Sequence, residues 1–389
     1  MFRARHLACA TFSILAFVCG SLGDASAEPK GIHATLSVVI DSLADVSGGA
    51  RRGLVPLDKA DLGVNIDAGA WGLDGFGAFV DVQQASGGGL SARFVGDAQG
   101  VSNIDGIPGF SLYQAWVERA WGDDAAVKAG IIDLNSEFDL QEIGTVFVNS
   151  SFGIGPEFAQ SGDMGPSIFP ATGIGARLSS AIGDVRFKLG VFDAVPRDLI
   201  HRHLPDVTLS SALLAGEAQW NIAKAHVKLG GWLYTSKLPD LNSVAGTRYG
   251  NHGLYASVSA RLYQEPGDNG AALDGWVRAG TSRATFNPIS TYVGGGLVYT
   301  GPIPGRSSDQ LGLGVASAIF GTQTRLANLP PLAAAETAIE LTYAAPVTGW
   351  LLVQPDIQYV IAPGGDTQIG DALVAGVRLS MSLAPSDAD

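Results

Sequence analysis

The amino-acid sequence predicts an all-β protein, a transmembrane antiparallel up-and-down barrel of about 16 strands. Three observations lead to this prediction. Apolar and polar residues alternate along most of the chain, which is the pattern of strands that face two different environments. The connections between these runs are alternately short and long. After the first 27 residues, no apolar run approaches the roughly 18 residues of a membrane helix.

The N-terminal segment has the organisation of a secretory signal. Basic residues precede an apolar stretch over residues 7–22, and the small residues of a signal peptidase site follow at 25–27. The apolar stretch is shorter than the roughly 20 residues of a membrane span. We therefore interpret residues 1–27 as a signal peptide, in preference to an uncleaved anchor or to a lipoprotein signal at Cys19.

Composition excludes several classes of function. Both cysteines lie within residues 1–27, so the exported chain has no disulfide, thiolate nucleophile or zinc–cysteine site. Without those residues, which hold two Arg and one Asp, 22 basic and 36 acidic residues leave a net charge of −14. This acidic balance argues against nucleic-acid binding. Charged residues are only 16% of the chain, which argues against disorder.

Runs of period-2 alternation predict the strands, each about 9–14 residues long. In residues 32–41 the even positions are apolar and the odd positions are mostly polar, which indicates a strand with two different faces. A soluble sandwich would show the same alternation, so the connections must separate the two folds. The predicted strands are 31–44, 60–71, 74–85, 111–121, 125–133, 171–181, 183–193, 212–221, 224–236, 252–264, 271–284, 290–301, 309–320, 335–345, 350–361 and 371–383.

The connections favour the barrel. Those after even-numbered strands are short and rich in Gly, Pro, Asp and Asn, as at 182–184 and 221–224. Those after odd-numbered strands are mostly longer, which is typical of a barrel with short periplasmic turns and long external loops. An even strand count places both chain ends on the periplasmic side. Several tryptophans stand beside short turns, where an interfacial aromatic girdle is expected: Trp71, Trp121, Trp220 and Trp350.

The strand predicted at 350–361 shows the two faces clearly. Gln354, Asp356 and Gln358 occupy every second position, and apolar residues fill the positions between. We expect the polar set to face channel water and the apolar set to face lipid. Pro355 has no backbone N–H, so the strand should carry a bulge or a local loss of pairing there.

The longest connection, residues 134–170, is predicted to fold into the barrel. It is too aromatic for a solvated tail, and connections of more than about 15 residues are usually functional or disordered. Inside a channel, its carboxylates would accept hydrogen bonds from hydroxyl groups and its rings would stack on sugar rings. The alternative is an external cap in which the phenylalanines form a small satellite core.

Charged residues on the predicted inner faces could complete a constriction, because opposed charges across a pore create a transverse field. Each could instead be a solvated lumen residue or part of an internal ion-pair ladder. The candidates for the narrowest part are Glu118, Asp133, Glu137, Phe138, Asp139, Phe152, Arg177, Arg186, Arg261, Arg278, Glu340 and Asp356, and none is expected to bind a metal.

The chain resembles the carbohydrate-selective porin family of the OprB type. The most specific segments are GNHGLYASVSARLYQ at 250–264, YVGGGLVYTGPIPGRSSDQLGLGVA at 292–316, ETAIELTYAAPVTGWLLVQPDIQYVIAPGG at 336–365 and DALVAGVRLSMSL at 371–383. The resemblance covers essentially the whole chain after the signal, so that residues 28–383 would form the barrel and residues 384–389 a short tail.

This resemblance implies a 16-stranded porin of the bacterial outer membrane that passes carbohydrates by diffusion, without catalysis or a cofactor. Its partners would be permeating sugars, outer-membrane lipid and the barrel assembly machinery, and it would be a monomer or a homotrimer. One departure concerns assembly, because the last strand ends at Leu383 instead of an aromatic residue.

Two other functions remain open at this stage. The first is a general diffusion porin with a weak preference for cations, which the negative charge would favour. The second is a soluble exported β-sheet protein, either a sugar-binding protein or an enzyme. The chain has no G-x-S-x-G motif for a nucleophile elbow. His201 and His203 are two residues apart, so a metal site there is conceivable.

Overall fold

The computed structural model describes residues 30–196, 211–241, 246–267 and 270–383. The predicted signal at 1–27, the tail at 384–389 and the pair His201/His203 lie outside these described residues. Among the helices of the described residues, none is long and apolar enough to cross a membrane.

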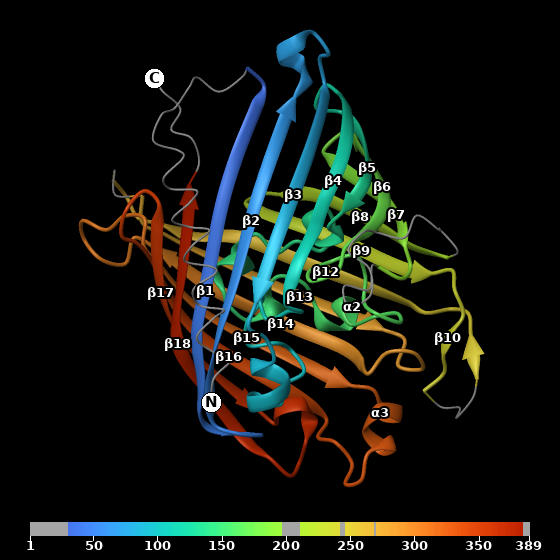
Figure 1. Cartoon of the computed structure of the whole chain (residues 1–389), viewed down its shortest axis with the longest axis vertical. Helices are drawn as coiled ribbons and strands as arrows, with labels where there is room; N and C mark the ends of the chain where they lie inside the picture. Colours follow the sequence, from blue (N-terminus) through green and yellow to red (C-terminus); the bar gives the residue numbers. More distant parts are fainter. Residues whose placement is uncertain (1–29, 197–210, 242–245, 268–269, 384–389) are drawn as a thin grey trace.

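The predicted barrel is confirmed: 16 antiparallel strands form one closed sheet (Figure 1). Two further short strands, β10 (Leu238–Pro239) and β11 (Thr247–Arg248), pair only with each other. The barrel strands are β1 (Ile32–Gly49), β2 (Gly53–Asp67), β3 (Phe76–Ser86), β4 (Gly109–Trp121), β5 (Ala125–Ile132), β6 (Gly173–Ile182), β7 (Val185–Asp193), β8 (Ala212–Ile222), β9 (Ala225–Tyr234), β12 (His252–Gln264), β13 (Ala272–Ser282), β14 (Ile289–Thr300), β15 (Gln310–Phe320), β16 (Ala335–Pro346), β17 (Leu351–Ile361) and β18 (Gly370–Leu383).

The first and last strands close the barrel. Leu36 of β1 pairs with Leu383 of β18, so the two ends of the strand sequence lie at the same end of the barrel. The short connections after β2, β4, β6 and β8 are at this end, together with exposed Trp71 and Trp121. The long connections are gathered at the opposite end or enter the barrel (Figure 1).

The outer wall is apolar and the inner wall is polar. On β17, Gln354, Asp356 and Gln358 are buried inside, whereas Ile357 and Tyr359 are exposed on the outside. Pairing between β16 and β17 is present up to Asp356 and resumes at Val353, so it is lost beside Pro355, although the pairing with β18 continues there. The missing N–H of proline explains this gap.

The first two strands are longer than predicted. Their connection is only residues 50–52, instead of the predicted 45–59. The polar–apolar alternation fails here because part of the inner wall is apolar: Val55 and Leu57 face inward and pack in one cluster with Leu90 and Val95 of another segment. A wall that is covered by protein does not need polar residues.

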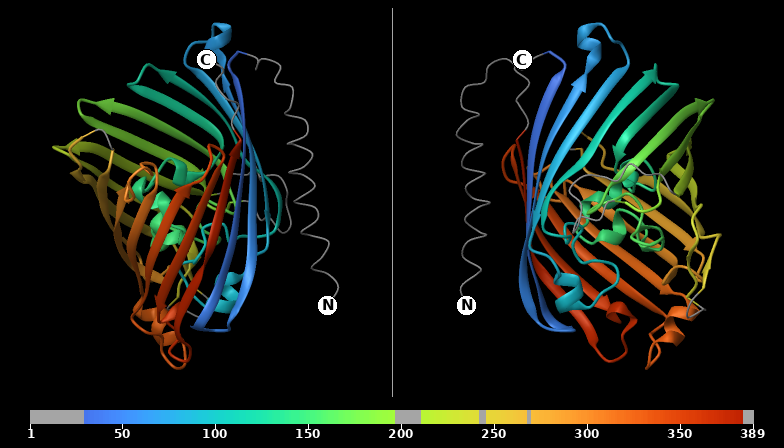
Figure 2. Two further views of the ribbon diagram at one scale, coloured as in Figure 1. Left: turned by 90° about the vertical axis from the view of Figure 1, so that its left-hand side faces the viewer. Right: turned by 45° about the vertical axis from the view of Figure 1, so that its right-hand side comes forward.

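Two connections fold into the barrel (Figure 2). The 87–108 loop joins β3 to β4 and contains the π-helix η2 (Ser91–Val95). The 133–172 loop joins β5 to β6 and contains η3 (Leu134–Ser136), η4 (Ile143–Val146), η5 (Ser150–Phe152) and α2 (Pro156–Ala159). Three further short helices lie in other connections between strands: η1 (Ala68–Trp71), α3 (Thr322–Ala327) and η6 (Pro363–Gly365).

Aromatic packing fixes the 133–172 loop against the wall. Phe158 stacks on Trp232 of β9 with ring centroids 5.1 Å apart. Phe147 and Phe152 pack on Trp276 of β13 at 5.1 and 6.1 Å. Each fully buried phenylalanine contributes roughly 1.5–3 kcal/mol, so the apolar side of this loop is firmly attached to the barrel.

Candidate functional site

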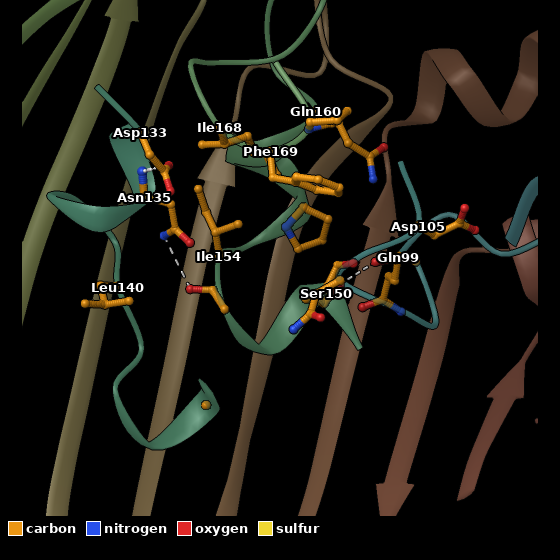
Figure 3. A pocket seen from close by; sticks show the side chains of 18 of the residues that line it. Gln99, Asp105, Asp133, Asn135, Leu140, Ser150, Ile154, Gln160, Ile168 and Phe169 are labelled. Atoms are coloured by element: carbon orange, nitrogen blue, oxygen red, sulfur yellow. Dashed lines mark hydrogen bonds between the residues drawn. The ribbon is translucent and has the colours of Figure 1, made fainter. Parts of the chain in front are cut away.

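A cavity of about 480 Å³ lies between the two infolded loops. One wall is formed by Tyr113 of β4 and by Asp133 at the end of β5. In the view of Figure 3, Asp133 and Asn135 lie on one side, Gln99 and Asp105 lie on the other, and Phe169 lies between them. The remaining lining residues are Ala98, Gly100, Asn103, Leu140, Gly144, Thr145, Ser150, Ser151, Gly153, Ile154, Pro156, Ala159, Gln160, Ile168 and Pro170.

The lining offers mostly neutral hydrogen-bonding groups. Four carboxamides and several hydroxyls surround the space, and the rings of Tyr113 and Phe169 add aromatic faces. Carboxamides and hydroxyls can both donate and accept, so they can exchange bonds with water or with a polyol. Within the described residues, no group of three or more His, Cys, Asp or Glu side chains is arranged to hold a metal ion.

Glu340 and its neighbours hold the middle of the 133–172 loop. The Glu340 carboxylate accepts the backbone N–H groups of Val148 and Asn149 at 2.6 and 2.9 Å. The Asn149 side chain donates to Gln358 at 3.1 Å. Gln354 donates to the carbonyl of Val146 at 2.7 Å. The polar face of β16 and β17 therefore binds protein backbone, and Asp356 lies buried among these groups.

A buried arginine holds a second part of this loop. Arg278 of β13 contacts both oxygens of Asp139, at 3.0 and 2.6 Å, and forms an ion pair with Glu157 at 2.7 Å. The backbone N–H of Asp139 donates to Glu217 of β8 at 2.9 Å. Buried ionic groups are costly without partners, so these contacts strongly favour one position of the loop.

A third attachment surrounds Glu137. Lys128 lies 2.5 Å and Arg177 lies 2.9 Å from its carboxylate oxygens, and Arg177 also contacts Glu118 at 2.5 Å. Burial alone would raise the pKa of Glu137, but Lys128 and Arg177 outweigh it, and the net pKa lies below the usual value. Lys188 donates to the Glu137 carbonyl at 2.8 Å.

The 87–108 loop is attached by a set of groups that shares only Gln358 with those described above. Glu336 of β16 accepts the N–H groups of Ala98 and Gln99 at 2.7 and 3.0 Å. Gln358 donates to the carbonyl of Val101 at 2.8 Å. Ser102 donates to Asp41 at 2.6 Å, and Asp41 pairs with Arg378 at 2.7 Å. Both loops thus use polar residues of the wall as anchors.

The structure separates the candidate residues into three groups. Asp133 lines the cavity. Arg186, which is half-buried, and Arg261, which is exposed, lie away from it, where they contact the carbonyl of Asp123 and the carboxylate of Asp274. The others lie in the loop or at its attachment to the wall: Glu118, Glu137, Phe138, Asp139, Phe152, Arg177, Arg278, Glu340 and Asp356. The charged candidates were expected either to oppose one another across the pore or to be solvated lumen residues or members of an internal ion-pair ladder, and most of them form close ion pairs, because buried charges are stable only beside a partner.

The contribution of the 87–108 loop to the cavity is not predicted from the sequence. Gln99, Asn103 and Asp105 come from this loop, and Phe169 comes from the end of the other. The signal was its length, since 22 residues without alternation separate β3 from β4. A connection of that length is usually functional or disordered.

A closed barrel with an apolar outer wall and a polar cavity between infolded loops is the architecture of a diffusion porin of the outer membrane. Residues 51–383 match the model of the carbohydrate-selective porin, OprB family. The chain belongs to this family and is an outer-membrane protein.

Individual relatives agree with this assignment. Porin B of Pseudomonas aeruginosa is 30% identical over 149 residues, which are 34% of this chain and 33% of that protein. The putative porin QuiX of Acinetobacter baylyi is 20% identical over 92% of this chain and 90% of its own length. The high-pH structure of Pseudomonas putida OprB superposes with a TM-score of 0.83 at 23% identity and covers 91% of this chain and 94% of that one. This structural likeness shows the fold.

Proposed function

We propose that the protein allows passive diffusion of carbohydrates, mono- and small oligosaccharides, across the outer membrane. This proposal rests on the cavity between the two loops, which is lined by amides, hydroxyls and aromatic rings. Its volume of about 480 Å³ lies within the roughly 300–1,000 Å³ of sites that take small molecules. Family membership supports a channel instead of an enzyme.

The lining suggests how a sugar would pass. Gln99, Asn135 and Gln160 would exchange hydrogen bonds with sugar hydroxyls, and the ring of Phe169 would pack on the apolar face of a sugar ring. Neutral groups form weak, replaceable bonds, so a solute could both enter and leave. Because the loops are anchored to the wall, width and hydrogen bonding would set the selectivity.

Reconstituted vesicles test this proposal. They are expected to swell with glucose and with a disaccharide. Phe169→Ala should slow glucose relative to sorbitol, which has the same size class but no ring. Phe187→Ala removes a phenylalanine from the exposed outer surface of β7 and serves as the matched control. Absence of permeation by any sugar would contradict the proposal, and equal rates for sugars and for charged solutes of both signs would favour a general porin.

The partners follow from the same proposal. The chain would be inserted by the barrel assembly machinery, contact outer-membrane lipid through its apolar wall and act as a monomer or a homotrimer. Detergent-solubilised protein on a native gel would distinguish the two oligomeric states. Recovery in the soluble periplasmic fraction without detergent would instead support a soluble binding protein.

A further inference from the structure

The cavity contains charge of one sign. Among the described residues that line it, Asp105 and Asp133 are the charged side chains, and none is lysine or arginine. They belong to different elements, since Asp105 is in the 87–108 loop and Asp133 follows β5. Figure 3 shows them on opposite sides of the space. A solute in the cavity is therefore close to at least one carboxylate.

Neutral donors hold both carboxylates in place. Asp105 accepts the backbone N–H groups of Gly89 and Ser91 at 2.6 and 3.1 Å. Asp133 accepts the Tyr113 hydroxyl and the N–H of Asn135, both at 2.9 Å. These bonds orient the oxygens but do not cancel their charge. The structure thus fixes two negative charges at the boundary of the space.

The cations of the inner wall are engaged elsewhere. They pair with carboxylates that attach the loops: Lys128 and Arg177 with Glu137, Lys228 with Glu142, Arg278 with Asp139 and Glu157, and Arg378 with Asp41. Lys59 comes nearer the cavity, with its Nζ 5.7 Å from the ring centroid of Phe169. It pairs with Asp61 at 3.2 Å and also acts electrostatically on Asp81 and Asp133, so one lysine faces three carboxylates and the local charge stays negative.

We propose that this cavity passes neutral sugars more readily than anionic ones, namely uronic acids and sugar phosphates, with Asp105 and Asp133 as the residues that determine this specificity. The inference rests on the sugar passage proposed above and narrows its substrate class. A sugar that carries a negative charge must approach a fixed carboxylate while part of its water is displaced. Between the dielectric of water and that of a protein surface, this repulsion corresponds to about a tenfold or larger reduction in rate.

The experiment compares two sugars of the same size and different charge. Vesicles that contain the full-length protein are loaded with glucose or glucuronate, and the release of each is followed at pH 8. This pH is chosen because burial raises the pKa of Asp133 and the test requires its ionised form. Wild-type protein is expected to release glucuronate about tenfold more slowly than glucose.

Asp105→Asn and Asp133→Asn should each raise the ratio of glucuronate to glucose release several-fold, because asparagine keeps an acceptor and removes the charge. Asp184→Asn changes a carboxylate in the exposed turn between β6 and β7 and should leave the ratio at its wild-type value. Equal release of the two sugars by wild type would overturn the inference while the proposed function stands. Release of neither sugar would instead count against the proposed function.

The wild-type protein offers a second measurement that does not depend on any variant. Salt screens charges, with a Debye length of about 30 Å at 0.01 M and about 3 Å at 1 M. Raising the salt concentration on both sides of the vesicle should therefore speed glucuronate and leave glucose constant. A glucuronate-to-glucose ratio that does not respond to salt would show that charge is not the cause of any difference.

Discussion

At the scale of single residues, the carboxylate of Glu340 is an anchor for the constriction. It accepts two consecutive backbone N–H groups of the 133–172 loop. A hydrogen bond within a protein contributes about 0.5–1.5 kcal/mol. Glu340→Gln retains one acceptor, so we expect the loop to loosen by an amount of that order. Reconstituted protein should then pass trisaccharides that wild type retards.

The matched control for this change is Glu265→Gln. Glu265 lies in the connection between β12 and β13, at the end of the barrel where the chain of strands begins and ends. It should leave the size limit unaltered. An unchanged size limit in Glu340→Gln would indicate that the other attachments, at Arg278 and Glu137, are sufficient to fix the loop.

The carboxyl group of Asp97, in the 87–108 loop, makes the stability of the protein dependent on pH. Burial raises its pKa from 3.8 to about 6. The folded state therefore holds this proton more tightly than the unfolded state, and stability falls as pH rises from about 4 to about 6.

The variant Asp97→Asn removes this titration. We expect the thermal midpoint of the variant in detergent to lie above that of wild type. The difference between the two midpoints should be larger at pH 7.5 than at pH 4.5. Asp184→Asn, in an exposed turn, should follow wild type at both values. A difference between Asp97→Asn and wild type that is the same at the two pH values would contradict the prediction.

At the scale of elements, β17 lacks a hydrogen bond to β16 that a substitution could restore. Pairing with β16 is lost beside Pro355, whose side chain lies on the exposed outer face. Pro355→Val supplies the missing N–H and should raise the free energy of unfolding by about 1 kcal/mol. Thermal unfolding of the detergent-solubilised barrel measures this. Ile357→Val, two residues along on the same face, should bring no gain; equal behaviour of the two variants would exclude a restored hydrogen bond.

At the scale of the whole molecule, the strands were predictable and the cavity was not. The alternation in β17 is imposed by the two environments on either side of the strand. Such a strand can therefore be recognised from its own stretch of sequence. The position of the 87–108 loop depends on Glu336, which is 238 residues from its partner Ala98 in sequence. Such long-range contacts leave no local pattern. The same limit explains why Arg278 looked like a pore residue, whereas it is almost completely buried between Asp139 and Glu157.

The two anchors on β16 also affect the relative position of the two infolded loops. Glu336 holds one loop and Glu340 holds the other, and both lie on the inner face of the same strand, four residues apart. A strand rises about 3.3 Å per residue, so this spacing is about 13 Å. The same strand therefore sets where both loops are held along the barrel wall. Bending of the barrel that displaces β16 would therefore carry both loops with it, and the direct hydrogen bonds between the loops, from the Asn103 N–H to the Val148 carbonyl and from the Ser150 N–H to the Gly100 carbonyl, would keep their relative position.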